Sequence, residues 1–283
     1  MSSIYDRTDI YDLLEDQTHW SAYKKHWKTL LQGKNVHSFL DVSIGSGSVT
    51  LPLCELGVQL AGSDLSEEMI RKCKEKASAA GYEIELKSCD FRKLSCWEGK
   101  QFDCVASTGN SLPHVNNDDV LTALEQMNSL VKKGGYLYLD TRNWEKILNE
   151  KRRFYRYNPV FAKKCRVNLV QVWDYSSEDT ITFNLLYTFE KENQIVQREI
   201  FEEKYYPIKK EMILSKLKMM GYTNISVYCF PSYFKMQNSN WLTGTVLWQK
   251  RMIKIKVLCG RNILNKAWKH FLSRRNRYWY CCH

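Results

Sequence analysis

The sequence lacks the cysteine patterns that mark metal sites. It contains no CxxC pair and no cluster of His and Cys at zinc spacing, so we expect no metal centre. Several of the ten cysteines lie inside apolar runs, which favours buried free thiols over a disulfide framework. The cysteines stand at 54, 73, 89, 96, 104, 165, 229, 259, 281 and 282.

Long apolar runs are also missing. None approaches the roughly 20 residues that a membrane-spanning helix needs. The first residues do not show the charged-then-apolar pattern of a signal peptide. With only 13 Gly and 5 Pro, long disordered linkers are not expected. We therefore predict a folded, cytoplasmic protein.

Acidic residues are absent from the last 35 positions, and this explains the net charge of +11. Ten Lys and Arg lie in 249–283, and the preceding 248 residues hold 32 basic against 31 acidic side chains. We therefore expect no nucleic-acid partner for the core. A basic amphipathic tail at 251–283 is able to bind anionic membrane. We prefer the interpretation that it is a dispensable extension.

Short apolar runs alternate with amphipathic stretches along the first half of the chain. One or two helices are expected at 9–32. Strands are then expected at 38–42, 59–63, 83–87, 102–107 and 136–140, and helices at 48–56, 66–80 and 118–132. This alternation predicts an α/β fold with a doubly wound parallel sheet that is covered on both faces.

The pattern changes after residue 150. Val, Thr, Tyr and Phe fill three expected strands at 167–175, 180–190 and 194–206, which indicates an antiparallel meander. A helix at 209–220 and strands near 223–229 and 243–249 would bring the main sheet to seven strands. We therefore predict a core of 1–149 and 209–250, an inserted antiparallel β cap at 150–208, and the tail 251–283.

The strongest motif is a glycine-rich turn between a strand and a helix. It follows Phe39-Leu40-Asp41-Val42 and contains Gly45 and Gly47, which permit a tight turn and close approach of a ligand. Asp64 ends the next strand, where a carboxylate accepts hydrogen bonds from a ribose diol. Together these features predict a Rossmann-like site for a nucleoside cofactor.

The third position of the glycine motif separates two classes of cofactor. Dinucleotide sites use Gly-x-Gly-x-x-Gly, but here the third position is Thr50. Asp41, just ahead of the loop, is placed to meet the cationic amino group of a methionine moiety rather than a phosphate. These features favour S-adenosyl-L-methionine over NAD.

Two further loops follow strands at the same edge of the sheet. Asp90 can accept from the adenine amino group, and Phe91 can stack on the base. Gly109-Asn110-Ser111 follows the fourth strand. Alone, Asp90 could equally be a helix N-cap and Gly109-Asn110 a simple turn. Their place in the series favours a role in the site.

These residues resemble a known family. Gly109-Asn110-Ser111-Leu112-Pro113-His114, Lys133-Gly134-Gly135, Asp140-Thr141-Arg142-Asn143-Trp144 and Tyr205-Tyr206-Pro207 are similar to segments of glycine N-methyltransferase and the glycine/sarcosine N-methyltransferases. The resemblance covers roughly residues 5–248. It implies a class I methyltransferase fold, S-adenosyl-L-methionine as cofactor, glycine or sarcosine as acceptor, and a homo-oligomer.

The resemblance also implies roles for residues. Arg142 would hold the substrate carboxylate, and Asn110 and His114 would lie beside the methionine part of the cofactor. Tyr5, Tyr11 and Tyr205 would be active-site tyrosines. The resulting candidate catalytic residues are Asn110, Arg142, Tyr205 and Tyr11. The resulting candidate cofactor-binding residues are Tyr5, Asp41, Gly45, Gly47, Asp64, Asp90, Phe91, Gly109, Asn110, Ser111 and His114.

The chain departs from the family pattern at three places. Ser43-Ile44 replaces Ala-Cys, His19 stands where an arginine is expected, and Ile208 replaces a histidine after Tyr-Tyr-Pro. Three alternatives therefore stay open. They are a methyltransferase of another small amine or hydroxyl of the natural-product or sugar type, an RNA methyltransferase, and a non-catalytic binding protein.

Overall fold

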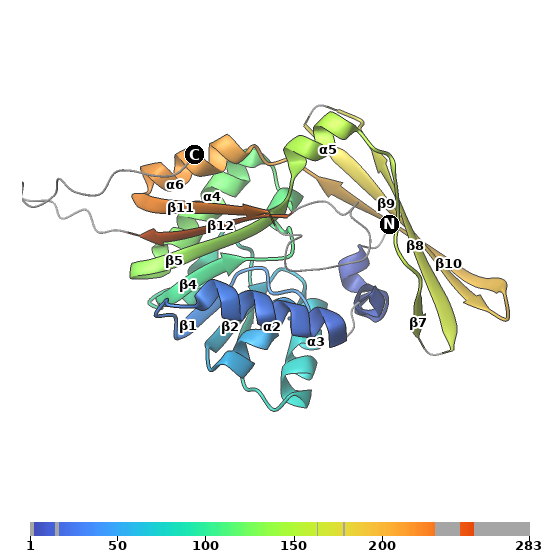
Figure 1. Ribbon diagram of the computed structural model, residues 1–283, viewed down its shortest axis with the longest axis horizontal. Helices are drawn as coiled ribbons and strands as arrows, with labels where there is room; N and C mark the ends of the chain where they lie inside the picture. The colour runs from blue at the N-terminus through green and yellow to red at the C-terminus, as the bar shows by residue number, and fades with distance from the viewer. Residues whose placement is uncertain (1–2, 15–16, 163, 178, 230–243, 252–283) are drawn as a thin grey trace, which may run out of the picture. The chain divides into compact units, whose positions relative to one another are not determined.

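The computed structural model describes residues 3–14, 17–162, 164–177, 179–229 and 244–251 (Figure 1). Its larger sheet has the strand order β11-β12-β5-β4-β1-β2-β3. The five strands from β1 to β5 pair in parallel, and β12 pairs antiparallel with β5 and β11. The strands are β1 (Ser38–Asp41), β2 (Gln59–Asp64), β3 (Glu85–Ser88), β4 (Phe102–Ser107), β5 (Val131–Arg142), β11 (Tyr222–Cys229) and β12 (Gly244–Arg251).

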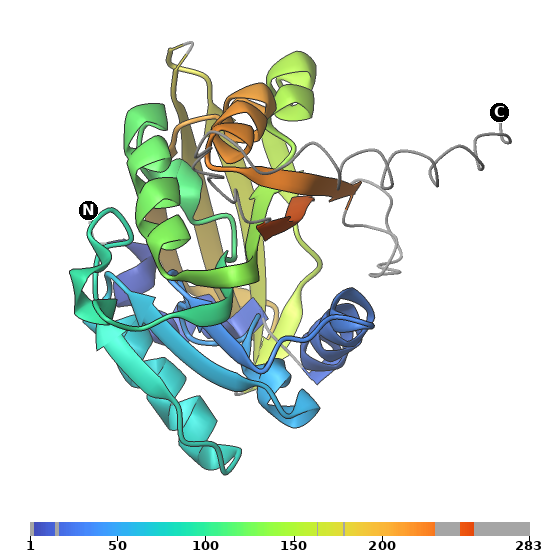
Figure 2. The same cartoon turned by 90° about the vertical axis from the view of Figure 1, so that its left-hand side faces the viewer.

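Helices cover both faces of this sheet because its central strands are apolar on both sides. In β1, Phe39 packs with Trp27 on one face, and its neighbour Leu40 packs with the other core cluster, which includes Leu124. Figure 2 shows α2 in blue and α4 in green on opposite sides of the sheet. The α-helices are α1 (Thr8–Tyr11), α2 (Gln17–Leu31), α3 (Glu67–Ala79), α4 (Asn117–Ser129), α5 (Trp144–Glu150) and α6 (Lys210–Met219).

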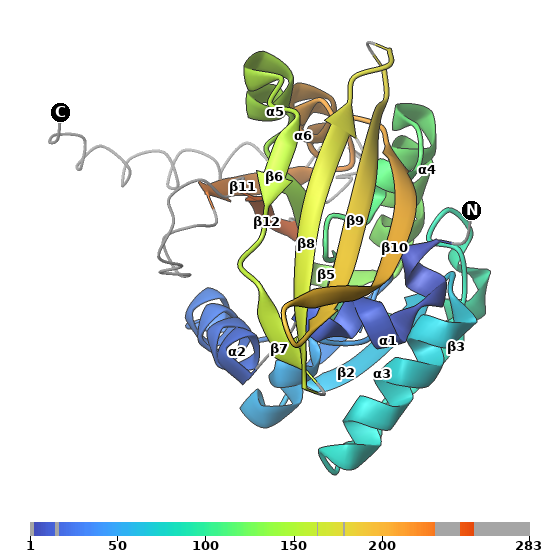
Figure 3. The same cartoon turned by 90° about the vertical axis from the view of Figure 1, so that its right-hand side faces the viewer.

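A second, antiparallel sheet has the order β10-β9-β8-β6, with β7 also paired to β8 (Figure 3). Its strands are β6 (Phe154–Arg156), β7 (Val160–Ala162), β8 (Cys165–Asp174), β9 (Ile181–Lys191) and β10 (Gln194–Tyr205). Alternate residues of β8 and β9 are buried, so one face packs against the core. Just after β10, the amide of Tyr206 donates to the carbonyl of Pro113 at 2.7 Å and so joins the end of this sheet to the segment that follows β4.

The predicted mostly parallel sheet and separate antiparallel sheet are confirmed. The predicted helix at 48–56 is wrong in type and in length. A 3₁₀ helix, η3, forms there, and it covers Leu51–Leu56. Pro52 lacks an amide hydrogen, and the hydroxyl of Thr50 donates to Asp41, so the backbone before η3 stays in turns. The strands β6 and β7 were not predicted because three residues are too few to show an alternation.

The prediction of free thiols is wrong at one pair. Cys89 and Cys96 form a disulfide, which closes the loop between β3 and the 3₁₀ helix η4 (Leu94–Trp97). Cys73 and Cys104 are free and buried as predicted. Within the described part of the chain, no helix is long and apolar enough to cross a membrane. The predicted tail lies outside the described residues, apart from Arg251.

Candidate functional site

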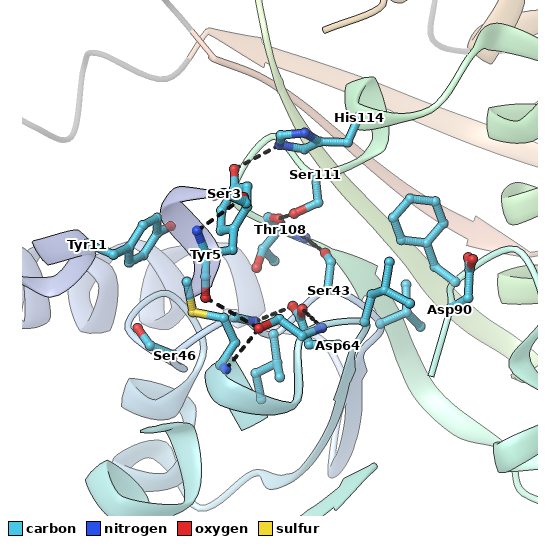
Figure 4. A pocket seen from close by; sticks show the side chains of 18 of the residues that line it. Ser3, Tyr5, Tyr11, Ser43, Ser46, Asp64, Asp90, Thr108, Ser111 and His114 are labelled. Carbon is cyan, nitrogen blue, oxygen red and sulfur yellow. Dashed lines mark hydrogen bonds between the residues drawn. The ribbon is translucent and has the colours of Figure 1, made fainter. Parts of the chain in front are cut away.

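A cavity of about 540 Å³ opens where β1, β2 and β4 end. Its size lies in the range of sites for small ligands and cofactors. Side chains reach it from the glycine loop after β1, the start of α3, the loop after β3 and the 3₁₀ helix η5 (Leu112–His114). The 3₁₀ helix η1 (Ile4–Asp6) and strand β10 complete its walls. Figure 4 shows Tyr5 of η1 together with labelled residues of the loops.

The two glycines of the loop are required for different structural reasons. Both have positive φ, +55° at Gly45 and +86° at Gly47. A Cβ on Gly45 would meet nothing within 4 Å, and Gly45 lines the cavity. A Cβ on Gly47 would lie 2.7 Å from both Cys73 Sγ and Leu51 Cδ1. Gly45 therefore leaves room for a ligand as predicted, but Gly47 is required by packing beneath the loop.

Asp41 does not line the cavity, contrary to its predicted contact with the cofactor. Its side chain is fully buried. One carboxylate oxygen accepts from the amide of Ser43 at 3.1 Å, and the other accepts from the hydroxyls of Thr108 at 2.6 Å and Thr50 at 3.1 Å. Asp41 thus holds the glycine loop against the end of β4, and it acts on a ligand only through that loop.

Asp64 lies where the sequence predicts it, at the end of β2 and in the cavity wall. Its two carboxylate oxygens accept from the amides of Gly45 at 2.8 Å and Ser66 at 3.0 Å. Burial raises its pKa, and these hydrogen bonds oppose the rise. The same carboxylate therefore fixes the glycine loop and presents acceptor oxygens to the cavity.

The loop after β3 places Asp90 and Phe91 in the cavity wall, as predicted. Asp90 is paired with Arg92, whose Nη2 donates to Oδ2 at 2.6 Å. This pair lowers the pKa of Asp90. Arg92 also donates to Asp119 at the start of α4, 3.1 Å away. An ionised Asp90 beside the Phe91 ring suits the amino group and the face of a purine.

The loop after β4 divides into lining and supporting residues. Gly109 and Ser111 line the cavity, whereas Asn110 does not. Asn110 has φ +60°, and its side-chain oxygen accepts from the amide of Arg142 at 2.8 Å and from the hydroxyl of Thr141 at 3.1 Å. This differs from the predicted direct role. Asn110 positions the end of β5, because its acceptor oxygen is used there.

Aromatic and polar side chains from three elements meet above the loop. The hydroxyl of Tyr5 and Nε2 of His114 are 2.8 Å apart, and the Tyr11 ring centroid lies 5.7 Å from that of Tyr5. All three residues line the cavity, as predicted. Burial and the charge of Arg142 lower the pKa of His114 to about 4, so its ring is neutral at pH 7.

Arg142 and Tyr205 form an aromatic site next to the cavity rather than in its wall. The Arg142 guanidinium lies 5.5 Å from the Trp173 ring centroid and 5.4 Å from that of Phe183. The Tyr205 ring contacts those of Phe183 and His114, with centroids 4.5 and 4.4 Å away. Nε of Arg142 is buried and has no hydrogen-bond partner among the residues that the structure describes.

Several residues of the cavity wall were missed by sequence reasoning, among them Ser66, Met69, Thr108 and Glu203. Glu203 lies in β10 and is only 7% exposed. In this strand Phe201, Glu203 and Tyr205 are buried and their neighbours are exposed. That alternation was visible in the sequence, and a carboxylate on the inward face of a strand was the signal for a site residue.

The departures from the family pattern fit the observed site. Ser43 Oγ lies 2.9 Å from the Ser107 hydroxyl and accepts from the amide of Thr108 at 3.0 Å. Ile44 packs over Gly62, where a Cβ would lie 2.3 Å from it. Ile208 is buried in the core. None of these side chains blocks the cavity.

Comparisons with known proteins agree with this geometry. Residues 39–135 match the family model described as a methyltransferase domain. The chain is 26% identical over 193 residues to a glycine/sarcosine N-methyltransferase of Aphanothece halophytica, covering 67% of each chain. It is 30% identical over 150 residues to a second, from Parasynechococcus marenigrum, covering 51% of this chain and 52% of that one. The chain thus spans about half to two thirds of the length of these relatives.

Solved structures share the fold at lower identity. An S-adenosylmethionine-dependent methyltransferase from Clostridium acetobutylicum has a TM-score of 0.67 at 19% identity, covering 87% of this chain and 98% of that one. CalS10, an amino pentose methyltransferase from Micromonospora echinaspora solved with S-adenosylmethionine bound, has a TM-score of 0.67 at 13% identity, covering 89% and 98%. At such identities the likeness concerns the fold alone.

Proposed function

This chain belongs to the class I S-adenosylmethionine-dependent methyltransferases and is similar to the glycine/sarcosine N-methyltransferases, and on that premise we propose that it methylates the nitrogen of a small amino acid. Glycine and sarcosine are the first candidates. The inserted antiparallel sheet serves as the substrate cap, because its buried face carries the aromatic rings around Arg142.

The cavity fits the cofactor. The space at Gly45 admits a ligand beside the backbone, Asp64 offers acceptors for a ribose diol, and Phe91 offers a ring for adenine. When bound, S-adenosyl-L-methionine supplies an electrophilic methyl group. A C–N bond forms, the C–S bond breaks, and its electron pair stays on sulfur. The protein's task is to position a neutral amine in line with that methyl group.

The observation that carries the proposal is the unpaired guanidinium of Arg142. Arg142 is half-buried, but its Nε is buried beside the Trp173 and Phe183 rings, and a buried donor is costly unless an acceptor accompanies it. Within the described residues, Arg142 Nε finds no acceptor, and no carboxylate forms an ion pair with the guanidinium. A substrate carboxylate would provide a bidentate partner in this apolar setting, and its amino group would then point along a fixed direction. Asn110 contributes by holding the Arg142 backbone.

The test combines cofactor binding with acceptor choice. Titration calorimetry measures S-adenosyl-L-methionine affinity, and a methyl-transfer assay compares glycine and sarcosine with amines that lack a carboxylate. We expect Arg142→Ala to lower kcat/KM for glycine or sarcosine by about 10²-fold, because it leaves a buried carboxylate unpaired. Arg142→Lys should recover little, because a lysine cannot form the bidentate pair.

The matched control is Arg153→Ala. Arg153 lies over the Phe154 ring, as Arg142 lies over Phe183, but it is exposed and paired with Asp174. We expect it to leave the kinetics unchanged. Turnover restricted to amines without a carboxylate would remove the amino-acid assignment and favour the sugar or natural-product type. Absence of cofactor binding would contradict methyl transfer itself.

A further inference from the structure

Among the described residues, Glu203 is a carboxylate without a Lys or Arg partner that is buried in the cavity wall. Glu203 Oε1 accepts from the Ser3 hydroxyl at 2.7 Å and from the amide of Ile4 at 3.1 Å. Oε2 lies 4.0 Å from Nδ1 of His114, beyond hydrogen-bond distance. No Lys or Arg of the described residues pairs with Glu203. One oxygen is thus left for a ligand.

We propose that Glu203 is a catalytic residue that binds the amino group of the methyl acceptor and takes its proton. The inference rests on the proposed function and adds the second half of substrate recognition. An amino acid carries two opposite charges at neutral pH. Arg142 matches the carboxylate, and Glu203 matches the ammonium group. His114 connects the two sites. Its Nδ1 lies 4.0 Å from Oε2 of Glu203, and its ring contacts that of Tyr205, which packs on the Phe183 ring beside Arg142.

The chemistry requires such an acceptor. An ammonium nitrogen has no free electron pair, so it must lose a proton before it can attack a methyl group. In the proposed step an N–H bond of the substrate breaks and an O–H bond forms at Oε2 of Glu203, which leaves a neutral amine and a neutral carboxylic acid. Nothing is oxidised or reduced. After methyl transfer the proton on Glu203 leaves to solvent, as does the extra proton on the product nitrogen.

The groups around Glu203 favour this role. Burial raises its pKa, the hydrogen bonds from Ser3 and Ile4 lower it, and the charge of Asp6 raises it. Tyr5 of η1 and Tyr205 of β10 interact with the Glu203 charge, and both phenols have raised pKa values. His114 of η5 is neutral at pH 7. In the part of the chain that the structure describes, Glu203 therefore faces no Lys or Arg, and a raised pKa makes its carboxylate a better proton acceptor.

A purely structural role is the competing explanation, because Glu203 also fastens η1 over the cavity. Two substitutions separate the roles. Glu203→Gln keeps the shape and an oxygen that can accept from Ser3 and Ile4, but it removes the charge and the proton acceptor. Ser3→Ala removes the 2.7 Å contact to Oε1 and leaves the carboxylate intact. Only the first change should affect catalysis strongly.

The first experiment is the pH dependence of kcat/KM with sarcosine. We expect Glu203→Gln to lose about 10²-fold at pH 7 and to recover as the pH approaches the amine's own pKa, where free amine is abundant. Ser3→Ala keeps the carboxylate but loses the hydrogen bond that lowers its pKa, so we expect a much smaller loss than in Glu203→Gln, with the acidic limb of the profile shifted to higher pH. Wild-type kinetics and an unchanged profile in Glu203→Gln would overturn the proposal, and so would an equal loss in both variants.

The second experiment measures binding without turnover. Sarcosine is titrated into protein saturated with S-adenosylhomocysteine, the demethylated product. We expect about 10-fold weaker sarcosine binding in Glu203→Gln than in wild type, with unchanged affinity for S-adenosylhomocysteine. Equal sarcosine binding would overturn the role of Glu203 while leaving the proposed function standing. If the wild type binds sarcosine but does not methylate it, the proposed function is wrong. The role of Glu203 in binding the amino group is then decided by comparing the sarcosine affinities of Glu203→Gln and wild type. No binding of glycine or sarcosine would reject both.

Discussion

Asp41 shows how a single buried residue links the cofactor loop to stability. Burial raises its pKa to about 7, although hydrogen bonds from Thr108, Ser43 and Thr50 oppose the rise and Asp140 adds to it. Burial also raises the pKa of Asp140 to about 6. Both carboxyl groups bind protons more tightly in the native state than in the unfolded chain. Their contribution to stability therefore falls as the pH rises from about 4 towards 7.

We predict that Asp41→Asn flattens this pH dependence. Because native Asp41 holds its proton more tightly than the unfolded chain does, the free energy of unfolding of the wild type should be up to about 4 kcal/mol lower above pH 7 than below pH 4. An asparagine keeps the acceptor for Ser43 and has no such cost. Urea unfolding at pH 5 and pH 8 measures the difference, and the variant should lose less stability than the wild type between these values.

Asp103 provides a control of opposite sign. Burial raises its pKa, but hydrogen bonds from Lys132, Ser38 and His37 outweigh this and lower it to about 2. Its stabilising effect is therefore complete above about pH 4 and is lost only below that value. Asp103→Asn should shift stability by the same amount at pH 5 and pH 8. An equal slope in Asp41→Asn and wild type would contradict the assignment for Asp41.

Individual site residues were predictable as far as strand ends determine them. Asp64 and Phe91 line the cavity because parallel strands bring their carboxyl ends to one edge. Asp41 and Asn110 were assigned direct roles, yet their oxygens accept from backbone amides and threonine hydroxyls of neighbouring segments. Whether a polar side chain points into a cavity or supports its wall depends on its rotamer and on hydrogen-bond partners that are distant in sequence. A local sequence pattern contains neither kind of information.

At the scale of elements, the disulfide between Cys89 and Cys96 closes the loop that carries Asp90 and Phe91. We predict that Cys96→Ser weakens S-adenosyl-L-methionine binding, because the freed loop must be ordered again when the ligand binds. For a loop of this size the chain-entropy estimate is about 2.5 kcal/mol of unfolding free energy. Calorimetry under oxidising and reducing conditions measures the affinity.

The control is Cys54→Ser, since Cys54 is a free and half-buried thiol. The wild type should lose affinity on reduction, Cys54→Ser should behave like the wild type, and Cys96→Ser should no longer respond to the reductant. Titration of two additional thiols in the native, oxidised protein would contradict the pairing. Sequence reasoning missed this bridge because spacing alone does not show which cysteines meet in space.

Elements with a long repeating pattern were predicted well, and short ones were not. The helices at 66–80 and 118–132 match α3 and α4 within a few residues, because each has an N-cap and a repeated apolar face. In η3 six residues replace the predicted helix of 48–56, since Pro52 and the Asp41 contacts override local propensity. Tertiary hydrogen bonds of this kind are invisible to periodicity.

For the whole molecule, the basic charge is concentrated at the C-terminal end of the chain, away from the sequence that forms the cavity. The described fold ends with β12, whose last residue Arg251 pairs with Tyr222 of β11. A truncation after Arg251 therefore preserves the complete sheet. It removes eight of the 42 basic residues and no acidic one, and so lowers the net charge from +11 to +3.

We predict that this truncated protein keeps the cofactor affinity, turnover and unfolding temperature of the full chain, because the cavity is built from residues before 204. Retention on a cation-exchange column should fall, since surface attraction follows net charge and is screened by salt. Calorimetry, the methyl-transfer assay and chromatography at increasing salt test both parts. If turnover were lost while cofactor binding persisted, residues 252–283 would have to contribute to substrate binding, and the main sheet with its cap would not suffice for catalysis.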